Sequence, residues 1–152
     1  MKRSYLRDGR APLPYSKSTS KVMSANRAKN TQPELILRKA LSREGISGYR
    51  LNWKKAPGRP DIAFPARRIA IFINGCFWHS CPYCHPSLPR SHTGFWKRKF
   101  ENNRRRDKEK TTQLRREGWK VLTIWECRLK KDPRRAINRV RQVLETIEVR
   151  SE

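Results

Sequence analysis

Three of the four cysteines and two of the three histidines of this chain fall within residues 72–85, directly after an apolar run. Joined by one distant cysteine, they form a set of four thiols whose spacing suits a tetrahedral zinc ion. The four are Cys76, Cys81, Cys84 and Cys127. Because four thiolates leave no open position for water, such a zinc would be structural. His85 in place of Cys84, or buried free thiols, are the alternatives, and we favour zinc.

Two further residues near this stretch could carry out catalysis. His79 lies between two of the cysteines, and a histidine that titrates near neutrality suits a general base for water in phosphodiester hydrolysis. Asp61 is predicted at the start of a strand, near the same sheet edge, where a carboxylate is a natural Mg²⁺ ligand. A packed or surface histidine and a turn-ending aspartate are the ordinary alternatives.

A carboxylate is also predicted on the inward face of each of two helices. Thr31 and Glu34 form a capping-box pattern, so a helix is predicted over residues 32–44. Glu34 lies three residues before Leu37 and can point along the same buried face. Capping alone would also explain this glutamate. Asp107 falls on the inward stripe of a long helix predicted over residues 93–117, whose outer faces are crowded with lysine and arginine.

Aromatic residues accompany these candidates. Phe77 and Trp78 follow the first cysteine, and Trp96 lies near the start of the long basic helix. Aromatic side chains beside a basic face can stack on bases or wedge between them. Ordinary core packing is the alternative for each one.

Strands must position these residues. We predict strands over residues 49–53, 61–64, 68–73 and 119–125, the second and third forming a hairpin, and a last helix that starts at Asp132 and Pro133. The last strand should be largely buried and should end at Glu126 and Cys127. This order predicts an α/β fold with a mixed central sheet flanked by helices.

The charge of the chain indicates its partner. There are 37 Lys+Arg against 13 Asp+Glu, giving a net charge of +24, so a polyanion is expected. The sequence contains no 18-residue apolar span, signal-like segment or basic amphipathic helix near its start, which favours nucleic acid over a membrane. Residues 1–30 are predicted to be a basic arm that orders on DNA, or else a disordered tail, and residues 31–150 a single domain. Clustered thiols without an export signal favour the cytoplasm.

Several motifs in a consistent order resemble one known family, the very-short-patch-repair (Vsr-type) mismatch endonucleases. The resemblance covers residues 20–127. Its motifs are Gly58-Arg59-Pro60-Asp61, Asn74-Gly75-Cys76-Phe77-Trp78-His79, Phe95-Trp96 followed by Asp107, Gly118-Trp119-Lys120-Val121-Leu122 and Trp125-Glu126-Cys127.

The resemblance implies a fold like that of the type II restriction endonucleases and Mg²⁺-dependent nicking of one DNA strand 5′ of the thymine in a T:G mismatch. Asp61 would bind Mg²⁺ with the backbone carbonyl of Ile73, and His79 would activate water. Glu34 and Asp107 match positions that support the waters around the metal and the catalytic histidine. Phe77, Trp78 and Trp96 would form a wedge beside the mismatch, with Met23 pressing from the minor groove.

The resemblance also implies the partners of the protein and its location in the cell, and this sequence departs from the family at Asn74. Partners would be double-stranded DNA with a T:G mismatch, a cytosine-5 methyltransferase system and mismatch-repair proteins, in a prokaryotic-type cytoplasm at the nucleoid. Single-strand nicking favours a monomer. Asn74 stands where studied members have a second histidine, and an amide cannot transfer a proton at neutral pH. Zinc ligands in better-known members mix histidine with cysteine, whereas here the four cysteines suffice.

Two other functions are compatible with these residues. A restriction-type or mobile-element nuclease on the same fold would cut matched DNA. A non-catalytic, zinc-stabilised DNA-binding module would need neither acid nor base. The joint presence of Glu34, Asp61, His79 and Asp107 argues against the second.

Overall fold

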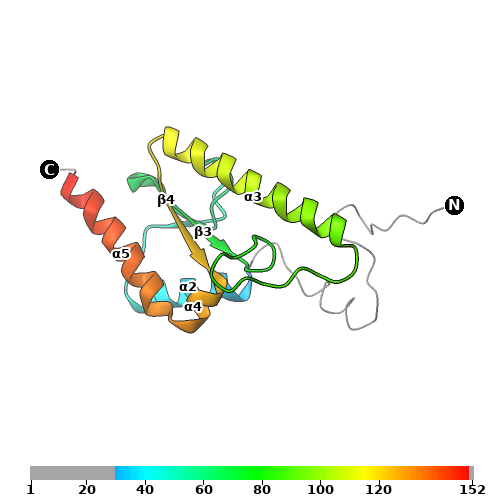
Figure 1. The fold of residues 1–152 in the computed structure, drawn as a ribbon. Coiled ribbons are helices and arrows are strands. Elements are labelled where there is room, and N and C mark those ends of the chain that lie inside the picture. Colours follow the sequence, from blue (N-terminus) through cyan, green and yellow to red (C-terminus); the bar gives the residue numbers. More distant parts are fainter. Residues whose placement is uncertain (1–29, 151–152) are drawn as a thin grey trace.

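The computed structural model describes residues 30–150, so Met23 and the predicted arm up to residue 29 lie outside the described residues. Helices surround a small group of strands (Figure 1). In order they are α2 (Gln32–Arg43), β1 (Arg50–Leu51), β2 (Ile62–Phe64), the 3₁₀ helix η1 (Pro65–Arg67), β3 (Ile69–Asn74), α3 (Thr93–Arg116), β4 (Lys120–Trp125), α4 (Glu126–Lys131) and α5 (Pro133–Arg150).

The four strands form one mixed sheet in the order β1-β2-β3-β4. β2 pairs antiparallel with both β1 and β3, whereas β3 and β4 are parallel, from Ile69 opposite Lys120 to Asn74 opposite Trp125. α3 is the crossover between these parallel strands, so the carboxyl ends of β3 and β4 meet at one edge. The predicted α/β class with a mixed, helix-flanked sheet is confirmed.

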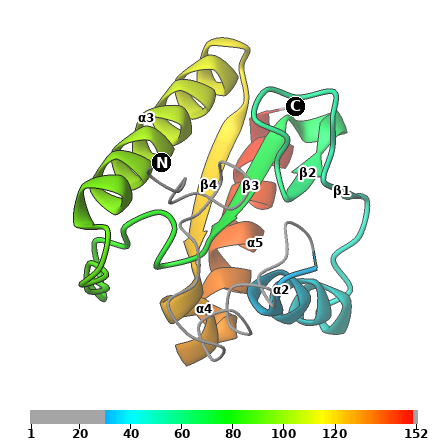
Figure 2. The same ribbon diagram turned by 90° about the vertical axis from the view of Figure 1, so that its right-hand side faces the viewer.

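Alternating residues of β3 pack against two separate cores. Ile69, Ile71 and Ile73 belong to the larger core, which also contains residues of α2, α4 and α5. Ala70 and Phe72 point to the other face, where they pack with Leu114 of α3. The helices therefore cover both faces, α3 on one and the other three on the opposite one (Figure 2). This arrangement explains why every residue of β3 is buried.

Several predicted boundaries move for identifiable reasons. β1 is only two residues long, because Asn52 has a left-handed backbone with φ of 46°. β3 begins one residue late, because Arg68 adopts the left-handed conformation that ends η1. Asp61 lies just before β2 rather than within it.

The end of β4 differs more from the prediction. The strand is only partly buried, and Glu126 and Cys127 start the short helix α4 instead of ending the strand. α4 has a single core anchor, Leu129, which is fully buried. One apolar residue in six gives no periodicity, so this helix could not be predicted from the sequence pattern.

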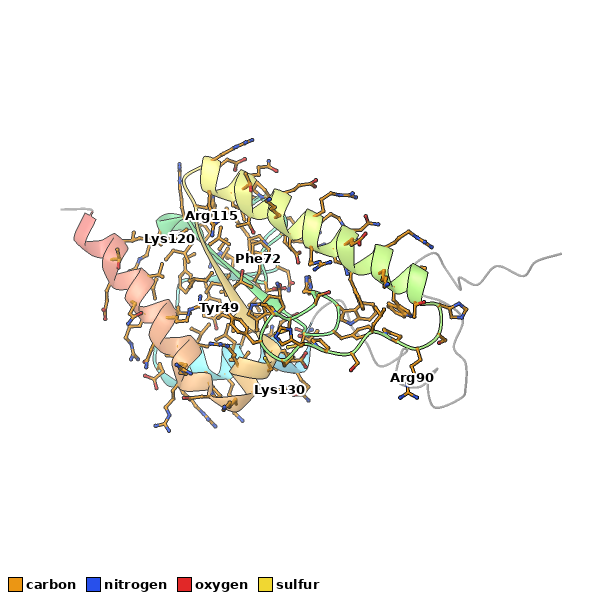
Figure 3. The ribbon with its side chains drawn as sticks, viewed as in Figure 1. Tyr49, Phe72, Arg90, Arg115, Lys120 and Lys130 are labelled. Atoms are coloured by element: carbon orange, nitrogen blue, oxygen red, sulfur yellow. The ribbon has the colours of Figure 1, made fainter. Side chains whose placement is uncertain are left out.

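Among the helices within residues 30–150, none combines the length and the apolar character that crossing a membrane requires. The side chains of these helices are instead densely charged on their outer surfaces (Figure 3).

Candidate active site

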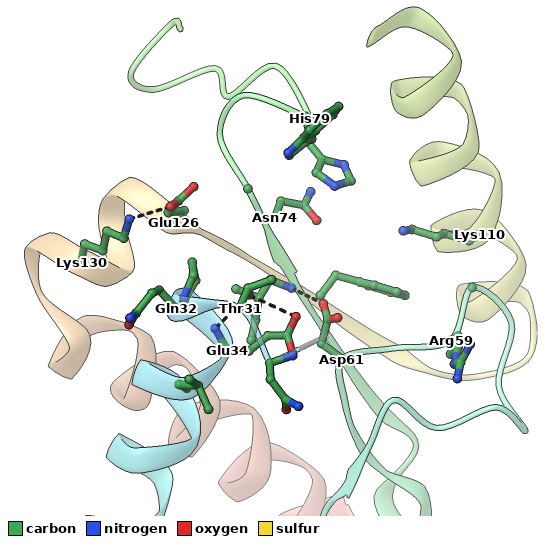
Figure 4. Close-up of a pocket in the computed structure, with 18 residues that line it drawn as sticks. Thr31, Gln32, Glu34, Arg59, Asp61, Asn74, His79, Lys110, Glu126 and Lys130 are labelled. Atoms are coloured by element: carbon green, nitrogen blue, oxygen red, sulfur yellow. Dashed lines mark hydrogen bonds and ion pairs between the residues drawn. The ribbon is translucent and has the colours of Figure 1, made fainter. Parts of the chain in front are cut away.

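A cleft of about 700 Å³ opens beside the carboxyl ends of β3 and β4, between the first turn of α2 and α3 (Figure 4). Six of the residues singled out in the sequence line it. They are Glu34, Asp61, Ile73, Asn74, Trp78 and His79. Residues spread over 46 positions of the chain thus converge on one site.

Asp61 is held at the floor of the cleft by the neighbouring strand. Its Oδ2 accepts a hydrogen bond from the backbone N–H of Ile73 at 2.7 Å. Burial raises the pKa of Asp61 to about 6; the Ile73 hydrogen bond opposes this shift, while the charge of Glu34 adds to it. A buried carboxylate beside a second carboxylate is stabilised by a cation, which makes this floor a candidate metal site.

Glu34 both caps the start of α2 and lines the cleft. Its carboxylate accepts hydrogen bonds from the backbone N–H of Asn30 at 3.0 Å and from the hydroxyl of Thr31 at 3.2 Å. The Thr31 hydroxyl in turn accepts a hydrogen bond from the Glu34 N–H, which is the N-cap bond of the capping box that the sequence predicts. Glu34 is only 7% exposed and still lines the cleft. Capping therefore fixes the carboxylate beside the site.

His79 and Asp107 form a pair. His79 Nδ1 lies 2.5 Å from Asp107 Oδ2, and both side chains are about three-quarters buried. Burial alone would raise the pKa of Asp107, but the hydrogen bonds and charges of His79 and Lys110 outweigh burial and lower it. An ionised Asp107 keeps the proton on Nδ1, which leaves Nε2 as the nitrogen able to accept a proton.

Asn74 ends β3 inside the cleft and is 7% exposed. It pairs with Trp125 at the last register position of the parallel strands. Its amide can donate or accept hydrogen bonds there but cannot transfer a proton at neutral pH.

The cleft also contains charged residues that the sequence analysis did not select. They are Arg59, Lys110, Glu126 and Lys130. Lys110 lies 3.0 Å from Asp107, three residues earlier on α3. Glu126 pairs with Lys130 at 2.6 Å and accepts a hydrogen bond from the backbone N–H of Cys76 at 3.2 Å. The parallel order of β3 and β4 would have pointed to Glu126, because it directly follows β4.

The four cysteines come together next to the cleft. Their sulfur atoms all lie within 4.8 Å of one another, and Cys81 Sγ is 3.7 Å from Cys127 Sγ. Four sulfurs at about 2.3 Å from a tetrahedral zinc would be about 3.8 Å apart, so this donor set could hold a metal ion. Cys84, not His85, belongs to the cluster.

Burial and backbone hydrogen bonds shift the pKa values of two of these thiols in opposite directions. Burial raises the pKa of Cys76. Burial also acts to raise the pKa of Cys81, but backbone N–H groups of Cys84 and Tyr83 outweigh it and lower the pKa. A thiol that ionises readily is a better ligand for a metal cation.

The aromatic residues form one cluster at the start of α3. The ring of Phe77 lies 5.1 Å from Trp78, 5.3 Å from Trp96 and 5.1 Å from Phe100. Phe77 and Trp78 are half-buried, and Trp96 is only 7% exposed. Trp78 alone of these rings lines the cleft. Their contact with DNA stays a prediction.

Gly58 gives a test of how tightly this cleft is packed. A Cβ atom there would lie 2.7 Å from the Cβ and Cδ of Lys110, and the backbone φ is +72°. Gly58→Ala should lower the free energy of unfolding by about 2–4 kcal/mol, from the left-handed backbone and the clash together. Gly45→Ala is the matched control, with φ of +68° and nothing within 4 Å, and should cost about 1–2 kcal/mol. Urea unfolding measures both, and equal losses would contradict the close packing.

Comparison with known proteins is consistent with this site. The sequence model described as DNA mismatch endonuclease Vsr matches residues 15–84. Type II nicking enzyme V.XorIIP of Xanthomonas oryzae pv. oryzae is 44% identical over 108 residues, which cover 71% of this chain and 79% of that protein. Type II nicking enzyme V.NmeAIP of Neisseria meningitidis is 40% identical over 83% and 91% of the two chains. DNA mismatch endonuclease Vsr of Escherichia coli is 37% identical over 73% and 70%.

The α/β fold, the cleft with its carboxylates and its histidine, and these relatives define a nicking DNA endonuclease. The chain belongs to the Vsr family of DNA mismatch endonucleases. The predicted family is thereby confirmed, and DNA is the partner that the net charge of +24 indicated.

Proposed function

We propose that this endonuclease nicks one strand of duplex DNA on the 5′ side of the thymine in a T:G mismatch, in a Mg²⁺-dependent hydrolysis. The observation that carries the proposal is the placement of Asp61 and of the His79–Asp107 pair in one cleft. The mismatch itself is supported by the name of the Escherichia coli relative.

In this proposal Asp61 and the backbone carbonyl of Ile73 hold Mg²⁺, with Glu34 close enough to raise the pKa of Asp61. Hard oxygen donors suit Mg²⁺, and a bound cation would offset the burial that raises the pKa of the Asp61 carboxyl. When bound, the ion supplies Lewis-acid stabilisation of the phosphate charge. Glu34 orders water around this site through its carboxylate.

His79 is the general base. Its Nδ1 proton is engaged by Asp107, so Nε2 takes the proton of the attacking water while Asp107 stabilises the resulting imidazolium. Asn74 donates an amide hydrogen bond to a phosphate oxygen. It fixes the position of the phosphate and takes no part in proton transfer.

The remaining predicted residues bind DNA or hold the fold. We propose that Cys76, Cys81, Cys84 and Cys127 hold a structural zinc ion. The aromatic residues Phe77, Trp78 and Trp96 would wedge beside the mismatch, with Met23 opposite them. A restriction-endonuclease-like architecture, a basic arm over residues 1–30, a single domain over 31–150 and a monomeric state complete the proposal.

The experiment compares three labelled duplexes that differ at one position: T:G, T:A and C:G. Each is incubated with Mg²⁺ or with EDTA, in several flanking sequences. We expect Mg²⁺-dependent cleavage 5′ of the mismatched thymine and none in the matched duplexes. Equal cutting of matched DNA would instead support a restriction-type or mobile-element nuclease, and tight binding without any cleavage would support a non-catalytic module.

A further inference from the structure

Lys110 lines the cleft, and no role proposed above uses it. It projects from α3 into the cleft, opposite Glu126 and Lys130 (Figure 4). Its side chain is only 24% exposed. Its Nζ lies 3.0 Å from Asp107 Oδ1 and 4.4 Å from the centre of the Phe72 ring. A lysine this enclosed requires partners for its charge.

The carboxylate of Asp107 connects Lys110 to the general base. Oδ2 contacts His79 Nδ1, and Oδ1 contacts Lys110 Nζ. One aspartate therefore fixes the base and the ammonium relative to each other. An ammonium has three N–H donors, and Asp107 accounts for one, so the others can reach a ligand in the cleft.

Neither of the other two cleft cations is placed in this way. Lys130 is half-exposed and paired with Glu126 at 2.6 Å. Arg59 is exposed, and its Nε donates to the carbonyl of Asn52 at 3.5 Å. Lys110, in contrast, is near enough to Asp61 for its charge to favour the ionised carboxylate. The absence of a side chain at Gly58 leaves the space that the Lys110 stem occupies.

We propose that Lys110 is a catalytic residue that binds a non-bridging oxygen of the scissile phosphate. His79 takes the proton of the attacking water as the bond from the water oxygen to phosphorus forms. The bond to the sugar oxygen breaks, and that oxygen leaves with the electron pair and takes up a proton from solvent. During this exchange negative charge is carried by the non-bridging oxygens. An ammonium fixed beside them stabilises that charge without reorganising. Asn74, being neutral, cannot supply this charge. The inference rests on the proposed hydrolytic function.

The first test is single-turnover nicking of the T:G duplex at saturating enzyme. Lys110→Met keeps the length of the stem that packs by Gly58 and removes the charge, so the rate should fall by about 30- to 300-fold. Affinity for DNA, measured in Ca²⁺, should weaken less than about threefold. Lys110→Arg keeps the charge and should recover part of the rate. Lys108→Met, at an exposed position of the same helix, should leave the rate unchanged.

A second measurement separates contact with the phosphate from support of Asp107. Substrates carry one sulfur at either non-bridging position of the scissile phosphate. We expect one diastereomer to be cut slowly by the wild type without relief by Mn²⁺, and this penalty to shrink several-fold in Lys110→Met. An unchanged penalty in a folded, slow variant would overturn the proposal, because Lys110 would then act only through Asp107.

The two proposals fail in different ways. If the wild type and the Lys110→Met variant nick the T:G duplex equally fast, the role of Lys110 is overturned and the proposed function is not. A wild type that nicks no T:G duplex in Mg²⁺ would overturn the proposed function and this inference with it.

Discussion

Asp61→Asn should lower the rate of nicking by about 10³-fold or more while making the metal-free protein more stable. The loss of rate follows because an amide is a poor ligand for Mg²⁺, and each 1.36 kcal/mol of lost transition-state stabilisation costs tenfold. The gain in stability follows because the amide oxygen can still accept the hydrogen bond from Ile73, 2.7 Å away in the wild type, without burying a charge.

The raised pKa of Asp61 determines whether the free energy of unfolding rises or falls with pH. Burial raises the pKa of Asp61 to about 6, against about 3.9 in an unfolded chain. Below about pH 4 the carboxyl is protonated in both states and costs nothing. Between about pH 4 and 6 the free energy of unfolding falls as pH rises, and above pH 6 the full cost of about 1–3 kcal/mol remains. Wild type should therefore gain this stability on acidification from pH 7, and Asp61→Asn should not.

Urea unfolding at pH 4.5 and 7, with and without Mg²⁺, checks this prediction. Mg²⁺ should stabilise the wild type at pH 7 and leave the Asp61→Asn protein unaffected. Asp132→Asn is the matched control, because Asp132 lies at the start of α5 and accepts a hydrogen bond from the Arg134 N–H, a cap that asparagine also forms. A destabilised Asp61→Asn protein, or one that nicks within tenfold of the wild type, would contradict the assignment.

Much of the fold follows from local patterns. The capping box at Thr31 and Glu34, the continuous apolar run of β3 and the three- and four-residue spacing along α3 each depend on near neighbours in sequence. These elements lie close to where they are predicted. α4 and the short β1 depend instead on a single core anchor, Leu129, and on a left-handed residue, Asn52. Neither leaves a periodic signal.

The residues of the candidate site likewise fall into those that the sequence could predict and those that it could not. Asp61 and His79 could be selected because their chemistry is unusual within their surroundings. Lys110 could not, since it is one of many basic residues on α3 and only the fold distinguishes its inward side from the outer faces. Trp96 is buried by packing against Phe77 and Phe100, which is the core packing that the sequence left open as the alternative to a DNA contact.

The largest expected effect on stability comes from the cysteine cluster. Residues 75–92, between β3 and α3, contain no helix or strand, yet they carry Trp78 and His79 into the cleft. Cys127, at the start of α4, is the ligand that would tie this segment to the rest of the fold. Structural zinc contributes about 10–16 kcal/mol of apparent binding free energy in small domains.

Cys127→Ala and Cys84→Ala should therefore each release zinc and lower the melting temperature by about 10 °C or more. His85→Ala should keep the metal and melt within a few degrees of the wild type, because His85 lies outside the cluster. Metal content of the purified proteins, a chelator titration and thermal unfolding measure these effects. If Cys84→Ala retained zinc and His85→Ala lost it, the fourth zinc ligand would be His85 and not Cys84. A wild type without bound zinc would leave the cysteines as free thiols, and the segment that carries His79 would then be held by contacts such as those with Glu126, with Asp107 and within the aromatic cluster.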